Sequence, residues 1–367
     1  MNLRRLTVTC VSLAVVALIL RSWFHTAEPD PAFQQAAAER AAQAAMSRVP
    51  EDHRRSSEFT YLTIPEWYLV WSPQEYAQFL KDGKPPSDFP FLGHLQQFWQ
   101  GYGVVCEETD KYPFNTDYHE MIWVIGTSTT VEYGLKWTYE KMVGRVSEAT
   151  VRGGTTTEED RICTQAAGEY IDLLFVEPWF KFDFMKPLRA VWSAEWWGTN
   201  PIRSWERKYL LTSEYLVKGA YGWVIRQASE SVFPDEKPVT AVVLDRYPEA
   251  ARQQLTEVKV IKEHADGSVL AFVPRYQPFT AQALLLAKTG SNFVEIAGNK
   301  DGILVSSVVS VYFLDPLGPR TVLTEPILTR PGEQRIVVSV PVGQLAELLR
   351  RYDSDRRRVR LEHVYDY

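Results

Sequence analysis

The chain has 367 residues, of which 45% are hydrophobic and 23% are charged, so it is neither a disordered nor a collagen-like protein. Its 40 basic and 46 acidic residues give a formal net charge of −6, and no nucleic-acid partner is expected. Its 3 cysteines exclude a disulfide-rich scaffold and a four-cysteine zinc site.

Residues 1–24 predict an uncleaved signal anchor, a single transmembrane helix that holds the protein in the cell membrane. Leu6–Leu20 carries no charge, and Arg4 and Arg5 precede it. A cleaved secretory signal is the weaker alternative, because cleavage after Ala27 would place His25 at the −3 position, where a small residue is required. Arginines ahead of the apolar run leave the N-terminus in the cytoplasm, so the body faces the periplasm or the extracellular side.

Residues 25–57 predict a helical stalk, because residues 31–47 are rich in alanine. Beyond the anchor the only cysteines are Cys106 and Cys163. An oxidising compartment would allow a disulfide between them, while two buried free thiols are the equally weighted alternative.

Residues 58–233 predict a mostly helical domain. Helices are expected at Gln74–Leu80, at Phe91–Val105, from Asn115 or Thr116 to about Ser147, from Thr157 to Val176, and from Pro201 to about Ser231.

Within this domain, residues 74–148 and 168–230 suggest a tandem helical repeat. Three spaced patterns recur in the same order: Glu-Tyr with a later Leu, Phe-x-Phe-x3-Leu-x3-Trp, and Glu-Tyr-x2-Lys-x2-Tyr. Duplication would pack two similar units against each other.

Residues 238–367 predict an α+β sandwich, of the split βαβ (ferredoxin-like) type, so the fold class is α+β in two domains. The stretch at 233–238 marks the boundary, and all 12 tryptophans lie before it. The expected strands are Val239–Leu244, Glu257–Glu263, Ser268–Val273, Asn292–Ala297, Ile303–Phe313, Arg335–Val340 and Arg358–Tyr365, with helices at Phe279–Lys288 and Gln344–Arg351.

The common nucleotide, zinc-protease and serine-hydrolase motifs are absent from the sequence. We therefore assign neither a cofactor nor a metal site.

The first candidate site is the pair Glu132 and Lys136, echoed by Glu214 and Lys218. Each pair has the favourable four-residue helical spacing. Two surface ion pairs are the preferred interpretation. Burial of both pairs between the repeats would instead form a polar pocket suited to proton transfer.

The second candidate site combines His119, with its neighbours Tyr118 and Glu120 on the long helix, and His94 on the preceding one. Two approaching histidines could relay protons or bind a metal. Satisfied core histidines are the more common case. Trp123 and Trp137 share the helix and would line an apolar ligand site.

The leading hypothesis is a membrane-anchored, extracytoplasmic interaction or apolar-ligand-binding module of the cell envelope. Its partner would be an envelope protein or an apolar small molecule. The alternative is an envelope enzyme that uses His119, Glu132, Lys136 and Tyr133 as acid–base groups on a lipid-like or aromatic substrate.

Overall fold

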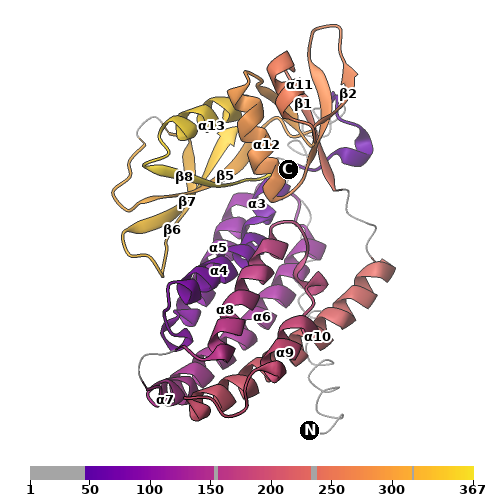
Figure 1. The fold of residues 1–367 in the computed structure, drawn as a ribbon. Helices are drawn as coiled ribbons and strands as arrows, with labels where there is room; N and C mark the ends of the chain where they lie inside the picture. The colour runs from indigo at the N-terminus through magenta and orange to yellow at the C-terminus, as the bar shows by residue number, and fades with distance from the viewer. Residues whose placement is uncertain (1–45, 153–155, 233–237, 316–317) are drawn as a thin grey trace.

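A computed structural model describes residues 46–152, 156–232, 238–315 and 318–367. Helices occupy one end of the molecule and two β-sheets occupy the other, which confirms the α+β class (Figure 1). The predicted anchor and the stalk up to residue 45 lie outside the described residues. Among the residues described, no helix combines the length and the apolar character needed to cross a membrane.

The first half of the chain is helical, as predicted. Its helices are α3 (Phe59–Leu62), α4 (Ile64–Lys81), α5 (Phe91–Thr109), α6 (Thr116–Tyr139), α7 (Arg145–Glu148), α8 (Glu158–Leu174), α9 (Met185–Ser193) and α10 (Pro201–Val232). A π-helical turn, Glu140–Gly144, joins α6 to α7. Two predicted caps are confirmed: the Asn115 and Thr157 side chains accept hydrogen bonds from backbone N–H groups in the first turns of α6 and α8.

The predicted start of the first helix is wrong. Ser72 and Pro73 resemble a cap and a first-turn proline, yet α4 begins at Ile64 and Pro73 lies inside it. The proline removes one backbone hydrogen bond. Burial of Tyr68 and Trp71 in one core cluster offsets that loss, because each aromatic side chain contributes about 2–3 kcal/mol.

Two helical units follow the same order. A 3₁₀ turn (Pro86–Asp88) separates α4 from α5 and α6, and another (Trp179–Lys181) separates α8 from α9 and α10. An aromatic trio packs alike in each unit. The ring of Tyr76 lies 4.9 Å and 5.8 Å from those of Phe89 and Phe91. In the second unit, the rings of Phe182 and Phe184 lie 5.2 Å and 5.8 Å from that of Tyr170.

The second half contains two four-stranded antiparallel sheets. The first has the order β2-β3-β1-β4 and the second the order β6-β7-β5-β8. The strands are β1 (Val239–Leu244), β2 (Lys259–Glu263), β3 (Val269–Pro274), β4 (Phe293–Ile296), β5 (Gly302–Ser310), β6 (Arg320–Pro326), β7 (Glu333–Pro341) and β8 (Val359–Val364).

The two sheets are connected in the same way. In each, the first strand lies between the third and the fourth, and a helix links those two: α12 (Gln277–Lys288) or α13 (Leu345–Ser354). They differ between the first and second strands. The first sheet places α11 (Glu249–Gln254) there, whereas the second has only residues 311–319, of which the described ones form no helix.

One hydrophobic core joins the two sheets, because α12 and α13 pack against each other between them. The other face of the second sheet is covered by the helical half: Leu304, Val337 and Tyr365 share a core cluster with Tyr68 and Trp71 of α4. The helical and sheet halves therefore pack directly against each other through a shared hydrophobic cluster.

The described end of the predicted stalk, residues 46–57, does not lead away from the body. It packs on the first sheet, where Val49 is buried with Ala241 and the His53 ring stacks on Phe272 at 4.4 Å. Arg48 forms an ion pair with Asp266 at 2.8 Å.

Candidate functional site

The two predicted Glu–Lys pairs meet in space. Lys136 Nζ lies 3.2 Å from Glu132 Oε1 and 2.7 Å from Glu214 Oε1. Lys218 Nζ lies 2.9 Å and 3.0 Å from the same two carboxylates. These four residues form a closed ring of ion pairs between α6 and α10, which we call the charge quartet.

The charge quartet is partly buried, with side-chain exposures from 14% to 37%. Burial alone would raise the pKa of Glu214, but Lys136 and then Lys218 lower it to about 2. Burial would lower the pKa of Lys136, yet the Glu214 carboxylate raises it above its usual range. All four groups are therefore ionised near neutral pH, and none is suited to exchange a proton there.

The ammonium groups of the quartet also cap the two aromatic trios. Lys136 Nζ lies 5.7 Å from the ring centre of Tyr76, and Lys218 Nζ lies 5.5 Å from that of Tyr170. These cation–π contacts repeat in both helical units. The quartet thus links the two units.

Tyr133 is buried beside the quartet, and its hydroxyl hydrogen-bonds Ser72 Oγ at 2.7 Å. Burial, and then the Glu132 carboxylate, raise the pKa of Tyr133. The phenol is therefore a neutral, hydrogen-bonded core group.

The two predicted histidines lie in different surroundings. His119 Nδ1 is 2.9 Å from the Tyr102 hydroxyl, and its ring stacks on Phe114 at 4.3 Å. His94 is buried beside Glu75, with 3.7 Å between His94 Nε2 and a carboxylate oxygen. Within the described ranges, no group of three or more His, Cys, Asp or Glu side chains could hold a metal ion.

Of the two alternatives for the cysteines, the structure has the free thiols: Cys106 and Cys163 are not bonded, although only Cys163 is buried. Cys106 is exposed on α5, while Cys163 is buried in a core cluster of α8 with Leu211 and Tyr215. The two cysteines therefore belong to different faces of the helical half.

A continuous uncharged surface runs along α6. Every exposed position from Met121 to Thr138 carries an uncharged side chain, including Trp123, Val131 and Trp137. Leu135, at 68% exposure, is the most exposed large hydrophobic residue of this stretch. A helix that faces water normally carries charged residues on its outer side, so this surface is unusual.

The same is true of α10. Each exposed position from Ile202 to Val224 is uncharged, and Tyr209, Val217 and Trp223 are all more than 60% exposed. The charged residues of this stretch, which include Arg203 and Arg207, point inward to buried ion pairs.

The two uncharged stripes lie on one side of the helix pair. The pairing of Lys136 with Glu214 and of Glu132 with Lys218 shows that α6 and α10 run antiparallel. On both helices the exposed stripe is turned around the helix axis by the same angle from the quartet residues. A two-fold relation between antiparallel helices keeps both stripes on the same side. We call this surface the outer face.

A second buried polar group, absent from the sequence-based predictions, lies where α4 meets the second sheet. We call it the junction cluster: Glu75, His94, Glu325, Arg335 and Glu362. Arg335 Nε lies 2.6 Å from Glu362 Oε2, and Arg335 Nη1 lies 3.6 Å from Glu75 Oε1. Its guanidinium also sits 4.2 Å above the ring of Trp71.

Burial is the largest influence on the pKa values of Glu325 and His94 in the junction cluster. It raises the pKa of Glu325 to about 8, because Arg335 lowers it only in part. Neither carboxyl oxygen of Glu325 has a hydrogen-bond partner among the described residues. Burial, aided by Arg335, lowers the pKa of His94 to about 3. At neutral pH the cluster therefore holds a largely protonated Glu325 and a neutral histidine.

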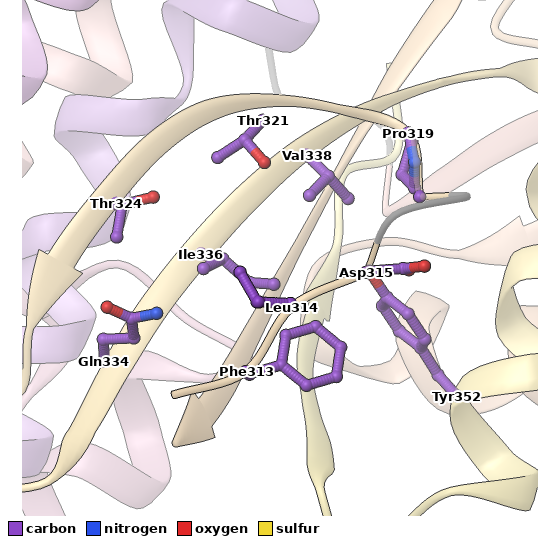
Figure 2. Close-up of a pocket in the computed structure, with 11 residues that line it drawn as sticks. Phe313, Leu314, Asp315, Pro319, Thr321, Thr324, Gln334, Ile336, Val338 and Tyr352 are labelled. Carbon is purple, nitrogen blue, oxygen red and sulfur yellow. The ribbon is translucent and has the colours of Figure 1, made fainter. Parts of the chain in front are cut away.

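A pocket of about 240 Å³ lies over β6 and β7 in the second sheet. Thr321 and Ile336 point into it from the strands, with Leu314 and Tyr352 on its other side (Figure 2). It lies next to the connection that, in the first sheet, contains α11. Its volume is below the usual 300–1,000 Å³ of drug-sized ligand sites.

Comparisons with protein-family models, with curated proteins and with solved structures gave no match for this chain. Function is therefore argued from its own residues.

Proposed function

We propose that this protein is a membrane-held interaction module of the cell envelope and that the outer face is its binding surface. The observation that carries the proposal is that no exposed position from Met121 to Thr138 of α6, or from Ile202 to Val224 of α10, is charged. A contiguous apolar surface of this length marks an interaction site in soluble proteins. The predicted anchor would hold the surface near a membrane. We also propose that each sheet is a split βαβ unit of the ferredoxin-like type and that the helical half is a tandem repeat.

The enzyme alternative receives less support from the same residues. The charge quartet keeps Glu132 and Lys136 ionised, and the phenol of Tyr133 is held by Ser72. His119 stacks against Phe114 at a distance from the quartet's ion pairs. These residues do not converge on one enclosed pocket.

Thiol protection in cells tests the proposal. Leu135→Cys is placed on the outer face and Glu347→Cys, as a matched control, on the exposed side of α13, both in a full-length chain without its native cysteines. If the outer face is covered in its native setting, a permeant thiol reagent labels position 135 much more slowly than position 347. Equal labelling would refute an interaction role for this face.

A further inference from the structure

We infer that the outer face lies in the surface layer of a lipid bilayer, with α6 and α10 parallel to the membrane plane. The inference rests on the proposed function and names lipid as what covers the face.

The dimensions of the outer face suit a bilayer surface. From Met121 to Thr138 the exposed stripe of α6 extends over about 26 Å at 1.5 Å per residue. Only one side of each helix is uncharged, because the other side packs on α5 or on α8 and α9. An amphipathic helix of this kind buries its apolar side about 5–10 Å into the headgroup and acyl boundary.

Tryptophan gathers near both ends of the outer face, as expected for residues at a membrane interface. Trp123 and Trp223 are 50% and 63% exposed at one end. At the other, the exposed Trp196 and Trp197 pack around Trp205 near the start of α10. Indole rings prefer this position because they combine an apolar body with one N–H donor.

The charge quartet is compatible with partial withdrawal from water. Two carboxylates and two ammonium groups sum to zero, and each lysine contacts both glutamates. Removing paired charges from water costs less free energy than removing isolated charges, for which the cost is prohibitive. Lipid above the quartet would therefore not require any of the four groups to change protonation.

The part of the chain that precedes the described residues favours lipid over other occupants. Leu6–Leu20 is uncharged and apolar, and only 25 residues (21–45) separate it from Met46. Such a linker spans about 38 Å if helical and about 80 Å if extended. A segment that enters the bilayer would thus hold the outer face within reach of the same membrane.

Depth-dependent fluorescence quenching tests this inference. The full-length chain, with Cys10→Ser, Cys106→Ser and Cys163→Ala, receives Leu135→Cys, or Val217→Cys as a second position, and is labelled with an environment-sensitive dye. It is reconstituted into vesicles of phosphatidylcholine and phosphatidylglycerol in equal amounts, with and without spin-labelled acyl chains. The control dye is attached through Glu347→Cys.

We expect the dyes at 135 and 217 to shift their emission to the blue and to lose most of it to the spin-labelled lipid, while the dye at 347 is quenched only by aqueous iodide. Iodide quenching at 135 and 217 equal to that at 347 would overturn the inference. So would protection from iodide without quenching by lipid, accompanied by cross-linking between two copies. In that case a second copy covers the face and the proposed function stands. Rapid thiol labelling of position 135 in cells would instead remove the proposed function itself.

Discussion

The buried carboxyl of Glu325 makes a sharp prediction about stability and pH. Its pKa is about 8 in the folded protein and 4.5 without the surrounding protein. The folded chain therefore keeps the proton above pH 4.5 while the unfolded chain releases it. The contribution of Glu325 to the free energy of unfolding therefore falls as the pH rises from about 4.5 to 8 and levels off above 8. The full difference corresponds to about 5 kcal/mol, an upper value because water can enter when the group ionises.

The substitution Glu325→Gln should remove this dependence, because glutamine keeps the shape and does not titrate. We expect its stability relative to the wild type to increase between about pH 5 and pH 8 and to stay constant above pH 8. The assay is urea denaturation of the full-length chain in a non-ionic detergent, followed by far-ultraviolet circular dichroism at each unit of pH. The exposed Glu347 provides the matched control Glu347→Gln, which makes the same change of side chain at the surface.

A stability difference between Glu325→Gln and the wild type that stays constant from pH 5 to pH 9 would refute the reasoning. It would mean that Glu325 titrates alike in the folded and unfolded chains. Water would then reach the two carboxyl oxygens of Glu325, which have no hydrogen-bond partner among the described residues.

Three further predictions concern the helical half. Gly126→Ala should destabilise the protein by about 1–3 kcal/mol, because the new methyl would lie 2.6–2.8 Å from two aromatic rings. The control is Gly134→Ala on the same helix, whose new methyl meets no atom within 4 Å. It should be neutral or stabilising in the same urea titration. Lys136→Gln should lower the free energy of unfolding by about 2 kcal/mol, because it leaves two carboxylates to share one ammonium group. If neutralising a second residue of the quartet leaves this loss of stability unchanged, the prediction is contradicted. In a chain without its N-terminal cysteine, a thiol reagent should modify Cys106 in the folded protein. Cys163, whose pKa burial raises to about 12, should react only after unfolding. Fast reaction of both thiols would show that α8 opens.

Local rules predicted most elements. The helix starts at Asn115 and Thr157 are read from a few adjacent residues, and in the structure both side chains cap their helices. Strand β6 was missed because its short run, Arg320–Pro326, follows a turn-rich stretch and alternates only in part. The start of α4 was missed because burial outweighed a local proline signal.

The candidate sites show where sequence reasoning stops. The charge quartet could be anticipated because each Glu–Lys pair lies within one helical turn, although only the fold brings the pairs together. The junction cluster could not, since Glu75 and Arg335 lie 260 positions apart in the chain. Glu325 is buried in β6, and because that strand was itself missed, its inward position could not be read from the sequence. The outer face left a trace, because Met121–Val131 is free of charged residues.

The contact between Arg335 and Trp71 provides the protein with a built-in optical reporter. Residues 234–367 contain no tryptophan, so intrinsic fluorescence arises from the helical side of the molecule. Trp71 nevertheless lies directly under a cation of β7. Its emission should change when the second sheet moves away from α4, even while the helices themselves stay intact. Subtracting the spectrum of a Trp71→Phe variant would isolate that signal and show whether the two halves separate before either one unfolds.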